Sequence, residues 1–357
     1  MHFDGGVTLA GFIVGIVVGM TGMGGGALMT PILVLVFGIT PLTAVSSDLV
    51  ASMIMKPIGS VVHVRKGTVR WGIVKWLALG SVPFAFAGVF VLRAVSNSDS
   101  LQGNVKIALG TALCLAASLI VVKGYMQYKR SRATGRAVRS ALHAPINIRP
   151  VPLLIIGAVG GLIVGMTSVG SGSLIIVCLM FLYPTLAGSE LVGTDLVQAV
   201  PLVAAAALGH ILYGDFQLGL TASLLLGSIP GVYLGARLSS RARDGVVRPA
   251  LVFVLLASGL KLLNVPTEAL GWILLAVAVL GLPIWGAFDA MQWSGDEWRR
   301  AGEDRSKWLR WQVLGAPFVV GAVAAVAYFV QTRPKLLRAS GIVTELPEAA
   351  EPQVVPL

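Results

Sequence analysis

Charged residues are scarce in this chain. Asp, Glu, Lys and Arg together make up 12% of the 357 residues, whereas hydrophobic residues make up 56%. A soluble domain carries about a quarter charged residues. Several apolar stretches reach the roughly 20 residues that a helix needs to cross a bilayer. The composition therefore excludes a soluble globular domain and predicts a multi-pass protein of the cell (inner or plasma) membrane, surrounded by the lipid bilayer.

Acidic residues are fewer than basic ones, 16 against 27, which gives a formal net charge of +11. In a soluble protein such an excess would suggest a nucleic acid partner. Here the basic residues lie mostly between apolar segments, where positive charge sets the orientation of a membrane protein. We therefore expect no nucleic acid partner.

Residues for catalysis and cofactor binding are also few. The two cysteines, Cys114 and Cys178, do not have the spacing of metal ligands. No Walker lysine is present, and the glycine-rich stretches do not follow a strand as a dinucleotide fingerprint requires. No nucleophile–base set is visible in the sequence. We therefore expect no metal, no cofactor and no enzymatic activity. The N-terminus has no basic stretch before its first apolar run, so no cleaved signal peptide is predicted.

Glycine, in contrast, is clustered twice. Residues 19–26 read GMTGMGGG, and residues 165–172 read GMTSVGSG. Both clusters lie within apolar stretches, and glycine weakens a helix. A repeated helix break at membrane depth is typical of a transport site, so we expect half-helices to begin near Ala27 and near Ser173. Close packing of helices through small residues is the alternative role of these glycines.

The clusters belong to an internal repeat. Asp48 matches Asp195 at a shift of 147 positions, His63 matches His210 at the same shift, and the glycine clusters align at a shift of 146. Matched polar residues and glycines carry more information than matched apolar ones, so the repeat is a strong signal. Further identical pairs at the shift of 147 are Leu49/Leu196, Val50/Val197, Gly67/Gly214, Gly72/Gly219, Gly80/Gly227, Ser81/Ser228, Pro83/Pro230 and Gly88/Gly235.

Loop charges indicate that the two halves face opposite ways. Arg65, Lys66 and Arg70 follow a span of the first half, whereas the matching residues 214–217 carry no basic charge. In the second half, basic charge lies instead within residues 237–248. Opposite bias at matched positions is typical of an inverted repeat. A parallel repeat with four spans in each half is the alternative.

The predicted fold is an all-α polytopic membrane protein with a two-fold internal repeat. Each half contains a Gly-broken re-entrant or split helix plus three spans, and two extra spans follow at the C-terminus. The predicted parts are a first transmembrane repeat (1–122), a basic cytoplasmic linker (123–150), a second transmembrane repeat (151–263), an extra C-terminal transmembrane pair (264–331) and a disordered tail (332–357).

The glycine clusters predict a site for a small anionic substrate at mid-membrane. A helix that begins there presents free backbone N–H groups, which attract anions. Lys56 adds positive charge, and a charge within the bilayer must face protein or water. The predicted substrate-binding residues are Thr21, Gly24, Gly25, Gly26, Lys56, Thr167, Gly170, Ser171, Gly172, Ser173 and Gln198.

Other polar residues of the spans are candidates for coupling or gating. On an ideal helix Lys56 lies about 80° and His63 about 60° around the axis from Asp48, so the three share a face. We predict coupling or gating roles for Asp48, Asp195, His63 and His210. Alternatively, the aspartates form a structural ion pair with Lys56, and the histidines act as hydrogen-bonding anchors.

These motifs resemble those of the TauE/SafE family of membrane permeases, also called the sulfite exporter or toluene-sulfonate uptake family. The resemblance rests on the G-x-x-x-G-x-x-G-x-GGG-x-x-x-x-P spacing of residues 15–31, the G-T-D-L stretch of 193–196, and the G-S-I-P-G-x-x-x-G run of 227–235. It implies a secondary transporter of small sulfur-containing anions such as sulfite, sulfonates or thiosulfate. A passive anion channel or facilitator, and a membrane assembly factor without transport of its own, stay open as alternatives. Whether the chain forms a homo-oligomer is also open.

Overall fold

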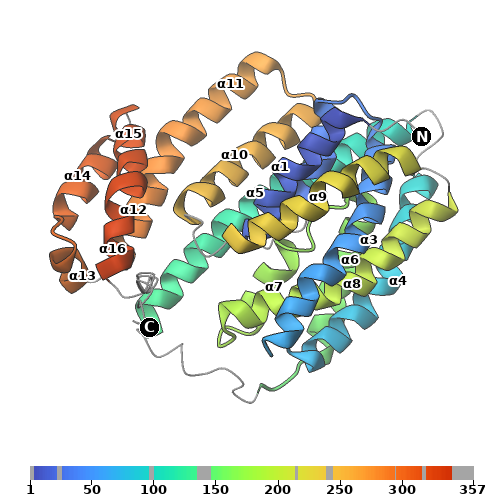
Figure 1. Cartoon of the computed structure of the whole chain (residues 1–357), viewed down its shortest axis with the longest axis horizontal. Coiled ribbons are helices and arrows are strands. Elements are labelled where there is room, and N and C mark those ends of the chain that lie inside the picture. Colours follow the sequence, from blue (N-terminus) through green and yellow to red (C-terminus); the bar gives the residue numbers. More distant parts are fainter. Residues whose placement is uncertain are drawn as a thin grey trace, which may run out of the picture. The chain divides into compact units, whose positions relative to one another are not determined.

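The protein is all-helical wherever its structure is described. A computed structural model describes residues 4–21, 26–95, 100–134, 146–213, 216–238, 244–293, 295–315 and 319–339. In these ranges the chain forms helices and no strand (Figure 1). Seven of the described helices are long and apolar enough to cross a membrane. The prediction of an all-α polytopic membrane protein is confirmed. The chain divides into two compact units, Met1–Gly271 and Trp272–Leu357.

Among its described residues, the first unit contains two successive sets of five helices, and the first two helices of each set are called the short pair here. The helix Pro150–Thr167 of the second pair has 18 residues and is itself a candidate span. The bounds of the first set are α1 (Gly5–Thr21), α2 (Gly26–Leu35), α3 (Pro41–Arg65), α4 (Trp71–Val95) and α5 (Leu101–Thr134). The bounds of the second set are α6 (Pro150–Thr167), α7 (Leu174–Leu182), α8 (Gly188–Leu212), α9 (Leu218–Leu238) and α10 (Asp244–Leu262).

Each glycine cluster lies where one short helix ends and the next begins. α2 begins at Gly26 and α7 at Leu174, next to the expected starting points. In the second cluster Ser168 has a φ of 59° and Gly170 a φ of 114°. These left-handed conformations cannot continue a right-handed helix, and glycine adopts them at little cost. In the first cluster, residues 22–25 lie outside the described residues.

The two ends of each short pair lie together. Just before α6, the amide of Arg149 donates to the hydroxyl of Tyr183, just after α7, at 2.8 Å. Around the first pair, a Cβ added to Gly6 in α1 would lie 3.1 Å from the ring of Phe37, two residues beyond α2. Each pair therefore returns to the end from which it started.

Glycines let the first helix of each pair approach a long helix of the other half. α1 packs on α9, and α6 packs on α4. A Cβ at Gly227 would lie 1.9 Å from the carbonyl oxygen of Thr8, and one at Gly161 would lie 2.3 Å from that of Ser81. Only glycine allows such close approach of two backbones. A Cβ added to Gly11, four residues before the next glycine of α1, would lie 2.9 Å from the carbonyl oxygen of Leu224 in α9, so the packing role also holds in α1.

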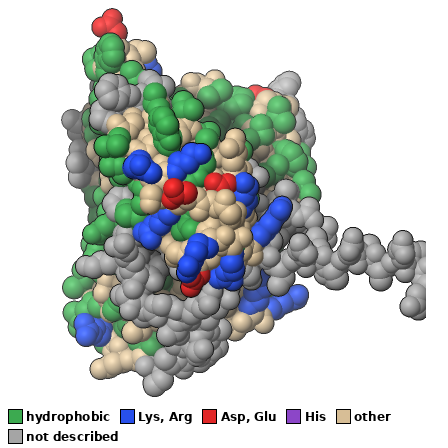
Figure 2. All heavy atoms as spheres, turned by 90° about the vertical axis from the view of Figure 1, so that its left-hand side faces the viewer, with side chains coloured by type: hydrophobic (Ala, Val, Ile, Leu, Met, Phe, Trp, Pro, Cys, Tyr) green, Lys and Arg blue, Asp and Glu red, His purple; other side chains and the backbone are tan. Residues whose placement is uncertain are grey.

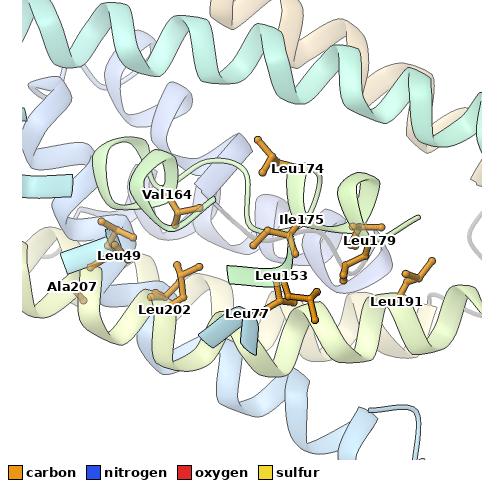
Figure 3. Packing of buried hydrophobic residues seen from close by; sticks show 14 of the residues in the cluster. Leu49, Leu77, Leu153, Val164, Leu174, Ile175, Leu179, Leu191, Leu202 and Ala207 are labelled. Atoms are coloured by element: carbon orange, nitrogen blue, oxygen red, sulfur yellow. The ribbon is translucent and has the colours of Figure 1, made fainter. Parts of the chain in front are cut away.

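Buried apolar side chains surround the second break. They come from α3, α4, α5, α6, α7 and α8 and from the segment that follows α7. Figure 3 shows Val164 of α6, Ile175 of α7 and Leu202 of α8 directed toward a common interior. Within a bilayer such packing is driven by van der Waals contact, because lipid tails are as apolar as the side chains. The cluster holds α7 and the break before it in place.

The linker and the C-terminal part differ from the boundaries drawn from the sequence. α5 continues to Thr134, so the linker predicted for 123–150 begins as helix, because its lysines, arginines and glutamine favour helix formation. In the predicted tail, residues 333–339 are helical, and 340–357 lie outside the described residues.

The helices after α10 form one long helical stretch and several short helices. Their bounds are α11 (Thr267–Ala276), the π-helical turn η3 (Val277–Gly281), α12 (Leu282–Gln292), α13 (Gly295–Arg300), α14 (Arg305–Gly315), α15 (Val319–Ala327), the π-helical turn η4 (Tyr328–Thr332) and α16 (Arg333–Ala339). Of the expected extra pair of spans, only residues 267–291 form a candidate span among the described helices. The second apolar segment does not form one helix, because α14 ends at Gly315 and α15 begins at Val319.

Candidate functional site

The start of α2 touches the second break. A Cβ added to Gly26 would lie 2.1 Å from the carbonyl oxygen of Ser168 and 2.9 Å from Oδ2 of Asp48. Gly26 is the last residue of the first glycine cluster, Ser168 lies in the second, and Asp48 lies in α3. The absence of a side chain at Gly26 therefore allows elements of both halves to meet at one point.

Asp48 is buried at this meeting point, with 3% of its surface exposed. The Ser168 hydroxyl donates to its Oδ2 at 2.5 Å, and the Thr30 hydroxyl of α2 donates to the same oxygen at 3.3 Å. A carboxylate within a membrane protein needs such donors, because it has lost its water. Sequence reasoning did not identify Thr30, although a hydroxyl inside an apolar half-helix is the signal that could have found it.

Lys56 contacts the second break through its ammonium group. Its Nζ donates to the hydroxyl of Ser171 at 2.8 Å. The charges of Asp195 and Asp48 both act on Lys56, but within the described part of the chain it forms no ion pair with either carboxylate. An ammonium group has three donors. The structure thus brings together Lys56 and Ser171, two of the predicted substrate-binding residues.

The second break also presents backbone donors. The amide of Leu174 donates to the carbonyl of Gly170, which starts α7. For the amides of Ser171, Gly172 and Ser173, the described residues supply no backbone acceptor. A helix N-terminus with free amides and a nearby cation attracts anions.

A small cavity of about 20 Å³ lies against this break. Its polar lining comes from Ser168 and residues 170–173, and Ala27 of α2 closes one side. Such a volume holds about one water molecule. Binding of an oxyanion here therefore requires the surrounding helices to move apart.

Thr167 and Gln198 make contacts other than those expected of anion ligands. Thr167 donates its hydroxyl to the carbonyl of Ile163 at 2.6 Å and accepts from the amide of Val169 at 3.2 Å, which fixes the shape of the break. Gln198 is fully buried, donates to Asp195 at 3.2 Å and accepts from Ser81 of α4 at 3.3 Å. Its amide therefore positions the Asp195 carboxylate.

The two histidines lie in different surroundings. His210 is fully buried, with Nδ1 2.7 Å from the Ser46 hydroxyl and Nε2 2.9 Å from the carbonyl oxygen of Gly165. A carbonyl only accepts, so Nε2 carries a proton, and the ring ties α8 to α3 and α6. His63 is half-buried near the end of α3, with Nδ1 3.0 Å from the Thr68 hydroxyl. It lies roughly 10 Å along the helix from Lys56.

Part of the predicted site lies outside the described residues. This holds for Gly24 and Gly25 and for the side chain of Thr21, whose backbone ends α1. The first break is therefore seen only through Gly26. Within the described ranges, no group of three or more His, Cys, Asp or Glu residues is placed to hold a metal ion.

Comparison with known proteins gives one family. A family model described as sulfite exporter TauE/SafE matches residues 7–262. The probable membrane transporter protein YjnA of Bacillus subtilis (strain 168) is 40% identical over 258 residues, which are 72% of this chain and 98% of that protein. The probable membrane transporter protein YdhB of the same strain is 24% identical over 258 residues, 72% of this chain and 99% of that protein. No solved structure matches. The family match ends before α11 begins.

Proposed function

Because the chain belongs to the TauE/SafE sulfite exporter family, whose relatives here are named membrane transporters, we propose that it is a secondary transporter of small anions. Its cargo would be sulfur-containing oxyanions such as sulfite, sulfonates or thiosulfate, moved across the cell membrane. The single observation that carries the proposal is the contact of Lys56 with Ser171 beside the amides of residues 171–173, for which the described residues supply no backbone acceptor.

In the proposed architecture, the two halves are an inverted repeat. The matched contacts at the ends of the short pairs, Arg149 with Tyr183 and Gly6 with Phe37, support a re-entrant hairpin in each half. The exchanged packing of α1 on α9 and of α6 on α4 supports a two-fold relation between the halves. Three crossings in each half then account for the opposite loop charges.

The anion would bind between the two glycine-rich breaks. It would take the place of the Ser171 hydroxyl as a partner of Lys56 and accept from the amides of 171–173. Gly26 would approach the anion from the other half of the chain, and Gly24 and Gly25, outside the described residues, stay predicted ligands. Thr167 would support the break, since its hydroxyl proton is already donated to a carbonyl.

The aspartates would couple the anion to protons. The charges of both Asp48 and Asp195 act on Lys56, so the proposed site contains two carboxyl groups and one cation. An entering anion would add negative charge to this buried site. A proton bound by Asp48 or Asp195 would offset the added charge. The histidines would have gating roles in the movement of one half against the other. His210 bonds α8 to α3 and α6, and His63 lies near the end of α3.

The small volume of the cavity favours alternating access over an open pore. About 20 Å³ is too little for an anion to pass without movement of the helices. Rocking of one half against the other would open the site to one side at a time.

Flux through purified protein tests the proposal. The full chain in liposomes should take up radioactive sulfite, faster with a pH gradient than without one. Lys56→Gln should abolish most of this uptake, while Lys106→Gln, at an exposed lysine bonded to Asn264, should not. Uptake that ignores the pH gradient would favour a passive channel. Absence of flux from the purified, folded chain would favour an assembly factor, and normal flux through Lys56→Gln would contradict the site.

A further inference from the structure

The C-terminal unit contains a helical hairpin that neither the family match nor the proposed transport accounts for. α14 and α15 pack against each other across a short connection. At that connection, a Cβ on Gly315 would lie 2.9 Å from the amide nitrogen of Gly321. Farther away, the rings of Trp308 and Tyr328 are 5.9 Å apart. Residues before and after the connection thus pair in antiparallel order, and the chain returns to the end where α14 began.

The return brings two basic segments to the same end of the unit. Lys335 of α16 donates to Glu303, just before α14, at 2.6 Å, and Arg333 pairs with Asp289 of α12 at 2.9 Å. Figure 2 shows Lys and Arg side chains gathered on one face, with acidic groups between them. The basic residues of this end are Arg299, Arg300, Arg305, Lys307, Arg310, Arg333, Lys335 and Arg338.

The acidic groups beside α14 already have partners. Asp304 caps the helix by accepting from the amide of Ser306 at 2.7 Å. Partial burial acts to raise the pKa of Glu303, but bonds from Lys335 and Trp308 outweigh it, and its pKa is lowered. Among the described residues, Lys307 and Arg310 form no ion pair within 4 Å. The charge of Lys307 acts on Glu303 without a direct contact, and Arg310 donates to the Ser306 carbonyl at 3.3 Å, so both exposed side chains keep donors for an external anion.

One face of α14 changes in chemistry along its length. Lys307, Arg310, Trp311 and Leu314 are spaced as i, i+3, i+4 and i+7 and share this face. All four are exposed, Trp311 by 54% and Leu314 by 72%. The opposite face is buried through Gln312 and Gly315. From Lys307 to Leu314 the helix rises about 10 Å and passes from cations through an aromatic ring to an apolar side chain.

This order matches the order of groups in a phospholipid. Cations meet headgroup phosphates, tryptophan prefers the interface, and leucine prefers the acyl chains. We propose that the exposed face of α14 binds an anionic phospholipid, with the phosphate at Lys307 and Arg310 and the acyl chains along Trp311 and Leu314. The site is independent of the proposed anion transport and belongs to the part of the chain beyond the family match.

Native mass spectrometry of the full chain tests the site. Protein purified in detergent is mixed with equal amounts of phosphatidylglycerol and phosphatidylcholine, and retained lipids are counted. The protein should retain mainly phosphatidylglycerol. A cation near an anionic lipid surface contributes about fivefold in affinity, so Lys307→Gln with Arg310→Gln should lower the preference about tenfold or more. The control, Arg65→Gln with Lys75→Gln, removes the same charge from exposed positions of the first unit and should keep the preference.

Two further arms separate the lipid from other occupants. Trp311→Ala with Leu314→Ser should weaken retention of both lipids, whereas glycerol phosphate, a headgroup without chains, should not displace the lipid at equal concentration. Equal loss in the α14 variant and the control would overturn the site in favour of diffuse charge attraction. A purified chain that retains no lipid at α14 but self-associates through it, with association lost in the Trp311→Ala, Leu314→Ser variant, would also overturn it.

Discussion

Ser168 donates its hydroxyl to Asp48 across 2.5 Å, although the two residues are 120 positions apart. This is the short end of the range for a hydroxyl bonded to a charged acceptor. The bond joins Ser168, in the second break, to α3 of the first half. Gly26, at the start of α2, lies against both residues, so α2 meets the same point. The shape of the second break therefore depends on a carboxylate that lies outside it.

Removal of this bond should destabilise the protein. In Ser168→Ala the buried Asp48 keeps only Thr30 as a hydroxyl donor, and loss of a partner for a buried polar group costs about 1–3 kcal/mol. Thermal unfolding of the purified protein in detergent should occur at a lower temperature. Ser173→Ala is the control, because the Ser173 side chain makes no capping bond at the start of α7. Equal shifts in the two variants would mean that the bond has no special role.

Anion binding should depend on the ammonium group of Lys56. In the unsubstituted protein, sulfite at about 100 times its dissociation constant should raise the free energy of unfolding by about 2.7 kcal/mol. Lys56→Gln should abolish this stabilisation, since the Ser171 partner then faces no charge. Lys56→Arg should retain part of it. The measurement is thermal unfolding across a panel of small anions, and a Lys56→Gln protein stabilised as strongly as the original would refute the assignment.

Added methyl groups should separate the helices that cross between the halves. Gly227→Ala places a Cβ 1.9 Å from a backbone oxygen of α1, and Gly161→Ala places one 2.3 Å from a backbone oxygen of α4. Overpacking costs about 1–3 kcal/mol, and backbone cannot move aside as a side chain can. Gly103→Ala in α5 meets nothing within 4 Å and should instead stabilise by roughly 0.5–1 kcal/mol. Denaturation of the three variants measures the difference, and similar values for all three would contradict the close packing.

The C-terminal unit should be dispensable for the anion site. The family match ends at residue 262, and the YjnA relative is covered over 98% of its own length by 258 residues of this chain. A chain that ends after Gly271 should therefore fold and be stabilised by sulfite as the full chain is, within about twofold in apparent affinity. Its retention of phosphatidylglycerol should fall. Loss of sulfite binding from a folded, truncated protein would place part of the anion site in the removed region.

Local signals in the sequence indicate where the second helix break lies. Glycine clusters act on the backbone of their own segment, and the predicted start near Ser173 differs by one residue from that of α7, while residues 22–25 before α2 lie outside the described residues. The spacing of Asp48 and Lys56 fixed the face that they share. It could not fix what lies opposite that face, so the Ser171 partner of Lys56 and the Thr30 partner of Asp48 needed the structure.

Contacts that depend on rotamers or on tertiary turns were beyond the sequence. Thr167 carries a hydroxyl that could bind an anion. This hydroxyl instead donates to the carbonyl of Ile163, one helical turn earlier in the chain, as threonine hydroxyls often do in helices. Gln198 shares a face with Asp195 and bonds to it, while Ser81 from another helix takes its oxygen. Hydropathy did not resolve the change of helix between Gly315 and Val319, because apolar residues continue on both sides.

The glycine contacts of α1 with α9 also bear on how the protein is made. α1 leaves the ribosome before α9, the helix against which it packs, which follows roughly 200 residues later. At a synthesis rate of about 5–20 residues per second, the first half waits roughly 10–40 s for that partner. During this time α1 and α2 sit in the membrane without their final neighbour. Biogenesis thus has a long unpaired stage, at which a chaperone or the insertion machinery would have to shield the first hairpin.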